Sequence, residues 1–125
     1  MKETSFITGR LQSFKYAWNG ICFLLKNERN AWIHIAAFIF VIFLGIWLQI
    51  SMAEWCLVFI VSALVMASEA FNSSVEKLVD HVSPGFNKTA GTIKDLAAGG
   101  VLLTAIAAII TGLLIFIPKV IALFQ

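Results

Sequence analysis

A long uncharged segment near the C-terminus constrains this chain most. From Leu96 to Pro118 the sequence contains no Asp, Glu, Lys or Arg, and this run exceeds the roughly 20 apolar residues that cross the hydrocarbon core of a bilayer. Sixty per cent of the 125 residues are hydrophobic and only 13% are charged, against about 25% charged in soluble domains. A soluble domain of this length could not bury so much apolar surface. The sequence therefore predicts an integral membrane protein in contact with the lipid bilayer.

Two further apolar segments are long enough to cross a bilayer. The first is interrupted only by His34 and Gln49, and the second begins near Ala53 and continues with helical spacing to His81. Backbone groups in lipid must form hydrogen bonds within their own segment, so each span is expected to be a helix. We predict a single all-α membrane domain over residues 1–125, with spans at about 31–50, 53–81 and 95–118.

The residues before the first span have the pattern of an amphipathic helix. Between about residues 10 and 27, apolar residues recur at steps of three and four, with polar residues between them. The apolar set is Leu11, Phe14, Trp18, Ile21, Cys22 and Leu25. This periodicity predicts a helix that lies in the membrane surface, with its apolar stripe at the acyl boundary.

Lysine and arginine are distributed unevenly about the spans. Five precede the first span and three lie between the second and third, whereas the turn between the first and second has none. They are Lys2, Arg10, Lys15, Lys26 and Arg29, followed by Lys77, Lys88 and Lys94. Because cytoplasmic loops are enriched in these residues, we predict a multi-pass protein of the bacterial inner (cytoplasmic) membrane with its N-terminus in the cytoplasm. A net charge of +2, without a dense basic stretch, argues against a nucleic-acid partner.

Four polar residues share one face of the second spanning helix. At about 100° per residue, Asn72 lies about 60° from Glu69, and Glu76 and Asp80 lie about 20° to either side of Glu69. A carboxylate at the depth of Glu69 is costly, so an ionisable group within a span is a candidate for function. The alternative is a polar stripe that holds helices together or projects into water. The position of Glu69 in the same row as Asn72 favours a functional site.

Glu28 lies at the cytoplasmic foot of the first span, on the same side of the membrane as Glu76. Two carboxylates from different helices supply the hard oxygen ligands that Mg²⁺ takes, with water and phosphate completing its coordination. The alternative is a surface ion pair between Glu28 and the neighbouring Lys26 or Arg29. Both interpretations stay open at the level of position alone.

The hydrophilic segment SPGFNKTAGT, residues 83–92, precedes Lys94 and Asp95, which we expect at the start of the last helix. Free N–H groups at a helix N-terminus, with a lysine nearby, make a phosphate site. The Walker A pattern is absent from the chain. This segment therefore gives only weak support for a nucleotide site.

Several strings resemble the prokaryotic diacylglycerol kinase family, which includes the undecaprenol kinases. They are SEAFNSSVEKLVD at 68–80, KDLAAGGVLL at 94–103, SFKYAWNGI at 13–21 and NERNAWIH at 27–34. They cover nearly the whole chain in order and with matching spacing. The resemblance implies a homotrimer of three-span protomers, each with an N-terminal surface helix. Its active sites would be shared between neighbouring protomers at the cytoplasmic interface.

The resemblance also implies an enzyme that phosphorylates a lipid alcohol, with ATP as co-substrate and Mg²⁺ as cofactor. Glu69 would be the general base, and Asn72 would position the base or the substrate. Glu28 and Glu76 would hold the Mg²⁺ that bridges the nucleotide phosphates. The remaining nucleotide contacts would come from Tyr16, Asp80, Lys94 and Asp95.

Two lipid substrates fit this resemblance. The strings around residues 13–21 and 28–34 look more like the undecaprenol kinases, whereas diacylglycerol kinases often carry an acidic residue at the position of His34. The family loop often has an acidic residue, an aromatic residue and a histidine where this chain has Gly85, Phe86 and Asn87, so the resemblance implies no acidic or histidine contact to the nucleotide from this loop.

Two interpretations compete with a lipid kinase. One is a non-catalytic helix-packing subunit of a membrane complex, which would explain the spans but not the row of acids on one side. The other is a proton relay, which the lack of ionisable partners in the outer halves of the spans disfavours. Independently of the resemblance, three thin helices are not expected to shelter Glu69 and Asn72 from lipid alone, and this predicts a homo-oligomer.

Overall fold

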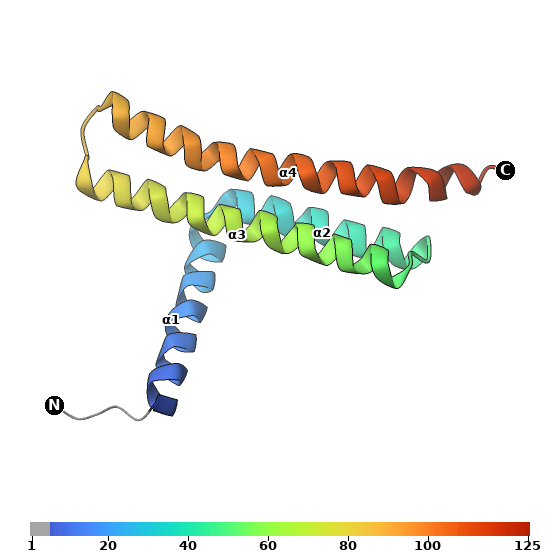
Figure 1. Ribbon diagram of the computed structural model, residues 1–125, viewed down its shortest axis with the longest axis horizontal. Coiled ribbons are helices and arrows are strands. Elements are labelled where there is room, and N and C mark those ends of the chain that lie inside the picture. The colour runs from blue at the N-terminus through green and yellow to red at the C-terminus, as the bar shows by residue number, and fades with distance from the viewer. Residues whose placement is uncertain (1–5) are drawn as a thin grey trace.

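The computed structural model describes residues 6–125, which form four α-helices (Figure 1). The helices are α1 (Phe6–Asn27), α2 (Arg29–Trp47), α3 (Met52–Val82) and α4 (Lys88–Ala122). Three of them, α2, α3 and α4, are long and apolar enough to cross a membrane. The predicted all-α class with three spanning helices is therefore confirmed. Lys2, one of the residues used to predict the orientation, lies outside the described residues.

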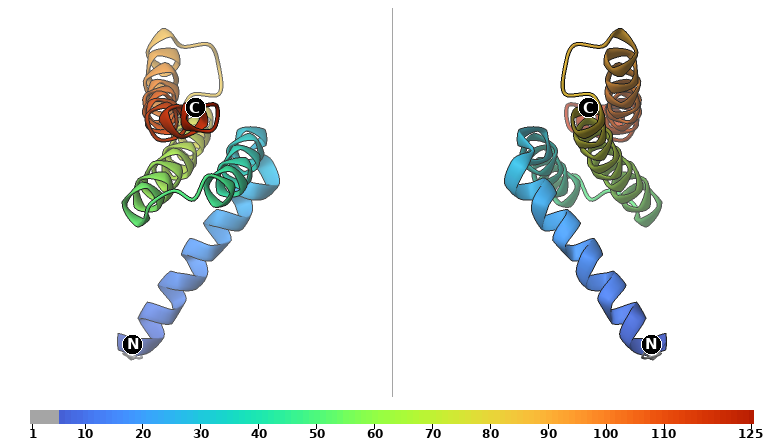
Figure 2. Two further views of the ribbon diagram at one scale, coloured as in Figure 1. Left: turned by 90° about the vertical axis from the view of Figure 1, so that its right-hand side faces the viewer. Right: turned by 90° about the vertical axis from the view of Figure 1, so that its left-hand side faces the viewer.

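The three spanning helices form a layer with α3 in the middle. Helix α3 packs against α4 along much of its length and contacts α2 less extensively (Figure 2). Hydrophobic side chains on the outer faces of all three helices are exposed, as expected for surfaces that lipid or other protein chains cover. Contact of α3 with both neighbours makes it the helix that positions the polar row.

The spanning helices differ in length, and the two longer ones carry polar residues beyond the end of the shortest. At about 1.5 Å per residue, α2 is about 28 Å long, whereas α3 and α4 are about 46 and 52 Å. The hydrocarbon core is only about 30 Å thick. The α3–α4 hairpin extends well past the start of α2 at the end where residues 83–87 connect the two helices (Figure 1). Glu76, Asp80 and Lys94 belong to this extension.

Helix α1 leaves the bundle at a steep angle where α2 begins (Figure 1). The corner is closed by two hydrogen bonds: the Glu28 N–H donates to the Leu24 carbonyl at 2.9 Å, and the Trp32 indole donates to the Leu25 carbonyl at 2.7 Å. These bonds satisfy carbonyls that a helix end otherwise leaves without a partner. Leu24 and Ala31 are buried at this corner. The corner therefore fixes the point at which the chain enters its first span.

The opposite end of the bundle is tightly packed. A core of Ile50, Val58, Ile115 and Phe116 joins α3 to α4 there. A Cβ atom added to Gly45 of α2 would lie 2.8 Å from the Trp55 ring, so α2 and α3 approach closely. Ser51 and Glu54 form a reciprocal capping box at the start of α3, and Glu54 pairs with Lys119 of α4 at 3.1 Å. This end holds the helices together.

Helix α4 begins at Lys88, so the prediction that Lys94 and Asp95 start this helix is wrong. Asn87 is its N-cap, and the Asn87 side-chain oxygen accepts a hydrogen bond from the Ala90 N–H at 3.1 Å. Asparagine is among the preferred N-cap residues because it satisfies such a free donor. Lys94 therefore lies well inside the helix and acts through its side chain, not through a helix N-terminus.

Candidate active site

Glu69 is the most deeply buried polar side chain of the site. Only 2% of its surface is exposed. Along the same face of α3, Asn72 and Glu76 are half-buried and Asp80 is exposed. The row thus runs from a sheltered carboxylate to one in contact with solvent, as its helical spacing predicts. This gradient follows the extension of α3 beyond the start of α2.

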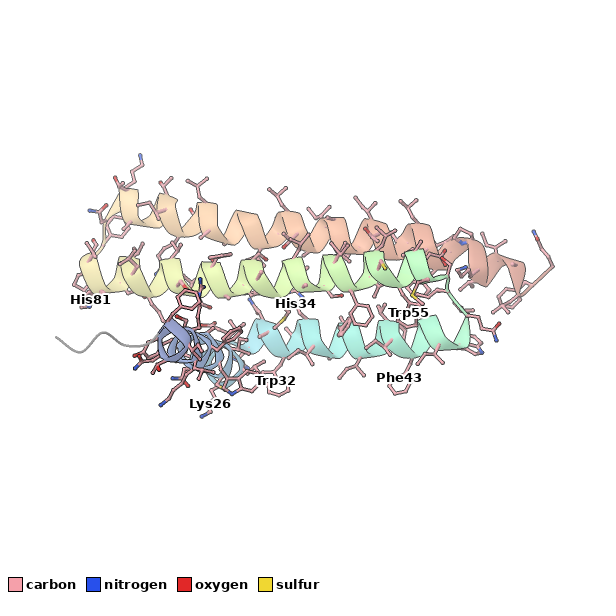
Figure 3. The ribbon with its side chains drawn as sticks, turned by 60° about the horizontal axis from the view of Figure 1, so that its bottom comes forward. Lys26, Trp32, His34, Phe43, Trp55 and His81 are labelled. Carbon is pink, nitrogen blue, oxygen red and sulfur yellow. The ribbon has the colours of Figure 1, made fainter. Side chains whose placement is uncertain are left out.

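A histidine from the neighbouring helix contacts the buried carboxylate. His34 Nε2 of α2 lies 3.2 Å from Glu69 Oε1 of α3, and the His34 side chain is 25% exposed. His34 projects from α2 toward α3 (Figure 3). On the other side, the hydroxyls of Ser68 and Thr104 hydrogen-bond at 2.8 Å and join α3 to α4. Polar contacts from both neighbours therefore set the rotation of α3 at this level.

Glu69 and Asn72 line a hollow of about 340 Å³ between the three spanning helices. Its other walls are His34 and the residues Asn30, Ile33, Ala98, Val101, Leu102 and Ala105. A longer groove of about 530 Å³ runs from His34 toward the packed end of the bundle, over side chains such as Phe38, Val65 and Ile109. His34 lines both spaces. A hollow with four polar residues in its wall therefore adjoins a predominantly apolar groove.

The two carboxylates expected to hold Mg²⁺ lie at the same end of adjacent helices. Glu28 is the N-cap of α2, but its carboxylate makes no cap hydrogen bond; instead it lies 3.9 Å from Lys77 Nζ. Its partner is thus neither Lys26 nor Arg29. Glu76 directly precedes Lys77 on α3, and Glu76 Oε1 accepts a hydrogen bond from Asn72 at 3.2 Å.

The donor atoms at this end fit a hard divalent cation. Asn72 Oδ1 is buried and has no hydrogen-bond partner, and the nitrogen of the same amide contacts Glu76, so a free amide oxygen lies beside one of the two carboxylates. Mg²⁺ takes such oxygen ligands and fills its remaining positions with water and phosphate. Within residues 6–125, no three His, Cys, Asp or Glu side chains gather as a closed metal cage. The arrangement suits a cation whose remaining ligands are water and phosphate.

The residues expected at the nucleotide are only partly brought together. Lys94 Nζ of α4 and Asp80 Oδ1 of α3 form an ion pair at 2.8 Å on the hairpin extension. Asp95 follows on the same helix and is exposed. Tyr16 is exposed on α1, and no hydrogen bond joins it to the other candidate residues in the part of the chain that the structure describes. The single chain therefore unites Asp80 with Lys94 but leaves Tyr16 apart.

Comparison with known proteins shows which family the chain belongs to. A family described as prokaryotic diacylglycerol kinase matches residues 15–116. The chain belongs to the prokaryotic diacylglycerol kinase family. An undecaprenol kinase of Bacillus subtilis is 35% identical over 86% of this chain and 88% of its own length. Diacylglycerol kinases of Synechocystis and Escherichia coli are 36% and 28% identical, over 90% and 87% of this chain and 65% and 89% of their own lengths.

Membership in this kinase family confirms the predicted enzyme class, a phosphotransferase that acts on an alcohol group of a lipid. It decides against the non-catalytic subunit and the proton relay. Together with the three membrane-spanning helices, it makes the chain a bacterial membrane protein. The row of acids on α3 then belongs to an enzyme.

Two residues at the site, Asn30 and Lys77, were not among those predicted from the sequence. Asn30 lines the hollow, and it precedes His34 by one helical turn, so the spacing alone places both on one face of α2. Lys77 contacts Glu28 across two helices, and no periodicity indicates this pairing.

The burial of Glu69 differs from what the sequence predicted. The prediction of a homo-oligomer assumed that the helices of one chain cannot shelter Glu69 from lipid, but Glu69 is buried within the single chain. The homo-oligomer stays a prediction.

Proposed function

We propose that this kinase transfers the γ-phosphoryl group of ATP to the hydroxyl of a membrane lipid alcohol at the cytoplasmic face of the bilayer. The observation that carries the proposal is the position of Glu69. Its carboxylate is buried, lines the hollow, and lies 3.2 Å from His34, which lines both the hollow and the apolar groove. A lipid in the groove would bring its hydroxyl to a carboxylate, and water-soluble ATP would approach along the polar extension of α3 and α4.

Undecaprenol is the acceptor that we favour, and diacylglycerol is the second candidate. The groove is a single furrow along α2, α3 and α4, which suits one long chain better than two. The names of the relatives leave both acceptors open, because an undecaprenol kinase and a diacylglycerol kinase are similarly identical to this chain. Either lipid presents a primary alcohol at the membrane interface.

Glu69 would act as the general base. As the lipid oxygen forms a bond to the γ-phosphorus, the bond from that phosphorus to the β–γ bridging oxygen breaks, and its electron pair leaves with ADP. The hydroxyl proton moves to the Glu69 carboxylate, which later releases it to water. Phosphoryl transfer requires positioning and charge neutralisation more than covalent catalysis, and a base within hydrogen-bond reach of the hydroxyl supplies the proton transfer. Asn72 would hold the substrate or the base in place.

Glu28 and Glu76 would hold Mg²⁺, with Asn72 Oδ1 as a neighbouring oxygen donor. When bound, Mg²⁺ supplies neutralisation of the charge that develops on the nucleotide phosphates. Lys94, oriented by Asp80, and Asp95 and Tyr16 would contact the nucleotide. Support for the roles of Glu28, Glu76, Asp80, Lys94 and Asp95 is that they lie at the same end of α2, α3 and α4. Tyr16 lies apart from them on α1, and its role rests on the family resemblance alone.

The kinase would work as a homotrimer in the bacterial inner membrane, with α1 as an amphipathic surface helix and the N-terminus in the cytoplasm. Tyr16 would then meet the nucleotide of a site that it does not reach in its own chain. Three protomers per detergent-solubilised particle, measured by light scattering with the detergent mass subtracted, is the expected result. A monomer with full activity would refute the shared site.

Purified protein incubated with radiolabelled ATP, Mg²⁺ and each lipid in turn tests the proposal. We expect phosphate to enter undecaprenol faster than diacylglycerol, and no transfer when Mg²⁺ is chelated. Faster phosphorylation of diacylglycerol would reverse the order of substrates. Transfer to neither lipid would contradict the proposed function.

A further inference from the structure

The contact between His34 and Glu69 joins two helices at the most sheltered point of the site. The residues are far apart in sequence, and their side chains meet at 3.2 Å between Nε2 and Oε1. Glu69 is 2% exposed, so water reaches it poorly. A carboxylate in such a place is costly unless hydrogen-bond donors replace its water.

His34 is the group that the structure provides for this purpose. The residues of α4 that line the hollow beside Glu69 are Ala98, Val101, Leu102 and Ala105, which have no polar side chains. Within residues 6–125, no other hydrogen bond to the Glu69 carboxylate is present. When Glu69 is ionised, the imidazole must be the donor, because a carboxylate can only accept. Nε2–H then points at Oε1, and Oε2 is left for another group.

His34 also lies at the junction of the two spaces that a lipid would occupy. It lines both the hollow and the apolar groove. A lipid whose chain fills the groove and whose hydroxyl reaches Glu69 passes this side chain.

We propose that His34 is a positioning residue for the general base: its Nε2–H holds Glu69 Oε1, and this orients Oε2 to take the lipid proton. The proposal rests on the proposed function, in which Glu69 is the base. A histidine that only fills space would be replaceable by any apolar side chain of similar size. A positioning histidine is replaceable only by a side chain that places an N–H at the same point.

Three substitutions of His34 separate these roles. Glutamine carries its amide nitrogen near the position of Nε2, asparagine carries it about one methylene closer to the backbone, and leucine has similar bulk without a donor. Because a misplacement of about 1 Å at a reacting centre costs about 100-fold, we expect His34→Leu and His34→Asn to lower kcat by about 10- to 100-fold. His34→Gln should stay within about threefold of wild type, since it keeps the donor.

The measurement is initial-rate kinetics of the full chain with ATP and undecaprenol, which separates kcat from the two KM values. The KM for ATP should stay unchanged, because the nucleotide binds at the polar extension. Gln49→Asn is the matched control, since Gln49 is an exposed polar residue in the turn between α2 and α3, at the packed end of the bundle away from the site. It should leave every constant unchanged.

The outcomes are separable. Unchanged kcat in His34→Leu, or equal loss in His34→Gln and His34→Leu, would overturn the positioning role. If the leucine variant fails to fold by circular dichroism, the glutamine and asparagine variants decide, and equal kcat values in these two would overturn it. A wild-type protein that phosphorylates no lipid would overturn the proposed function itself, and full activity of Glu69→Gln would overturn the base assignment.

Discussion

At the scale of single residues, the site depends on how each acid of α3 is surrounded. Glu69 is buried and touches a histidine, Glu76 accepts from Asn72, and Asp80 pairs with a lysine in solvent. Carboxylates spaced by one or two helical turns thus meet three different environments, because the bundle covers only one end of the row. Three carboxylates with different partners are suited to different tasks.

Glu28→Gln and Glu76→Gln test the cation site. Each change removes one negative oxygen ligand, and we expect the Mg²⁺ concentration for half-maximal rate to rise by about 10- to 100-fold. The check is a titration of the initial rate with Mg²⁺ at saturating ATP and lipid. Glu54→Gln is the control, because Glu54 is a carboxylate at the opposite end of the bundle, paired with Lys119. An unchanged Mg²⁺ requirement in both site variants would show that other groups hold the cation.

At the scale of helices, composition predicts the spans well because hydropathy integrates over many residues. The expected span 53–81 is Met52–Val82 in the structure. Helix ends depend on single residues instead. The Asn87 cap starts α4 well before Lys94, and α1 begins at Phe6, ahead of the expected residue 10, because single polar residues do not end a helix.

The sequence predicted the residues of the site better than it predicted the contacts between them. The spacing on α3 gave Glu69, Asn72, Glu76 and Asp80 a common face. The pairs His34–Glu69 and Glu28–Lys77 depend on how α2 is rotated against α3. An almost uniformly apolar helix has no strong stripe that fixes this rotation, so it depends on contacts such as the close approach at Gly45 and the His34–Glu69 pair itself.

Gly45→Ala tests the close approach of α2 and α3. The added methyl group would lie 2.8 Å from the Trp55 ring, and such overpacking costs about 1–3 kcal/mol. We expect a lower midpoint of thermal unfolding in detergent. Gly20→Ala on α1 is the matched control, because nothing lies within 4 Å of its added carbon and alanine favours the helix by up to about 1 kcal/mol. Equal midpoints for Gly45→Ala and wild type would mean that the helices are not held in this contact.

At the scale of the whole molecule, the bundle has two unlike ends. One end is closed by an apolar core and the ion pair of Glu54 with Lys119. The other end opens into the hollow and continues as the polar hairpin extension. The contacts that hold the helices together thus lie at one end of the bundle, and the candidate site lies toward the other. The site can therefore stay open to lipid and nucleotide without loosening the bundle.

The orientation of the bundle can be measured with a pair of cysteines. Met52→Cys and Phe86→Cys, in a chain with Cys22 and Cys56 changed to serine, mark opposite ends at highly exposed positions. The excess of lysine and arginine on one side predicts that a membrane-impermeant maleimide labels residue 52 in spheroplasts and residue 86 only in inverted membrane vesicles. The reverse pattern would place the hollow on the outer side, away from ATP.

The most direct test of the central claim is phosphate transfer by Glu69→Gln beside the wild type. Glutamine keeps the size of the side chain and can still hydrogen-bond, but it cannot take a proton from the lipid hydroxyl. We predict that kcat for undecaprenol falls by about 100- to 10,000-fold, the usual contribution of a general base, while binding of a non-hydrolysable ATP analogue stays near wild type. Near-normal turnover in this variant would contradict the account.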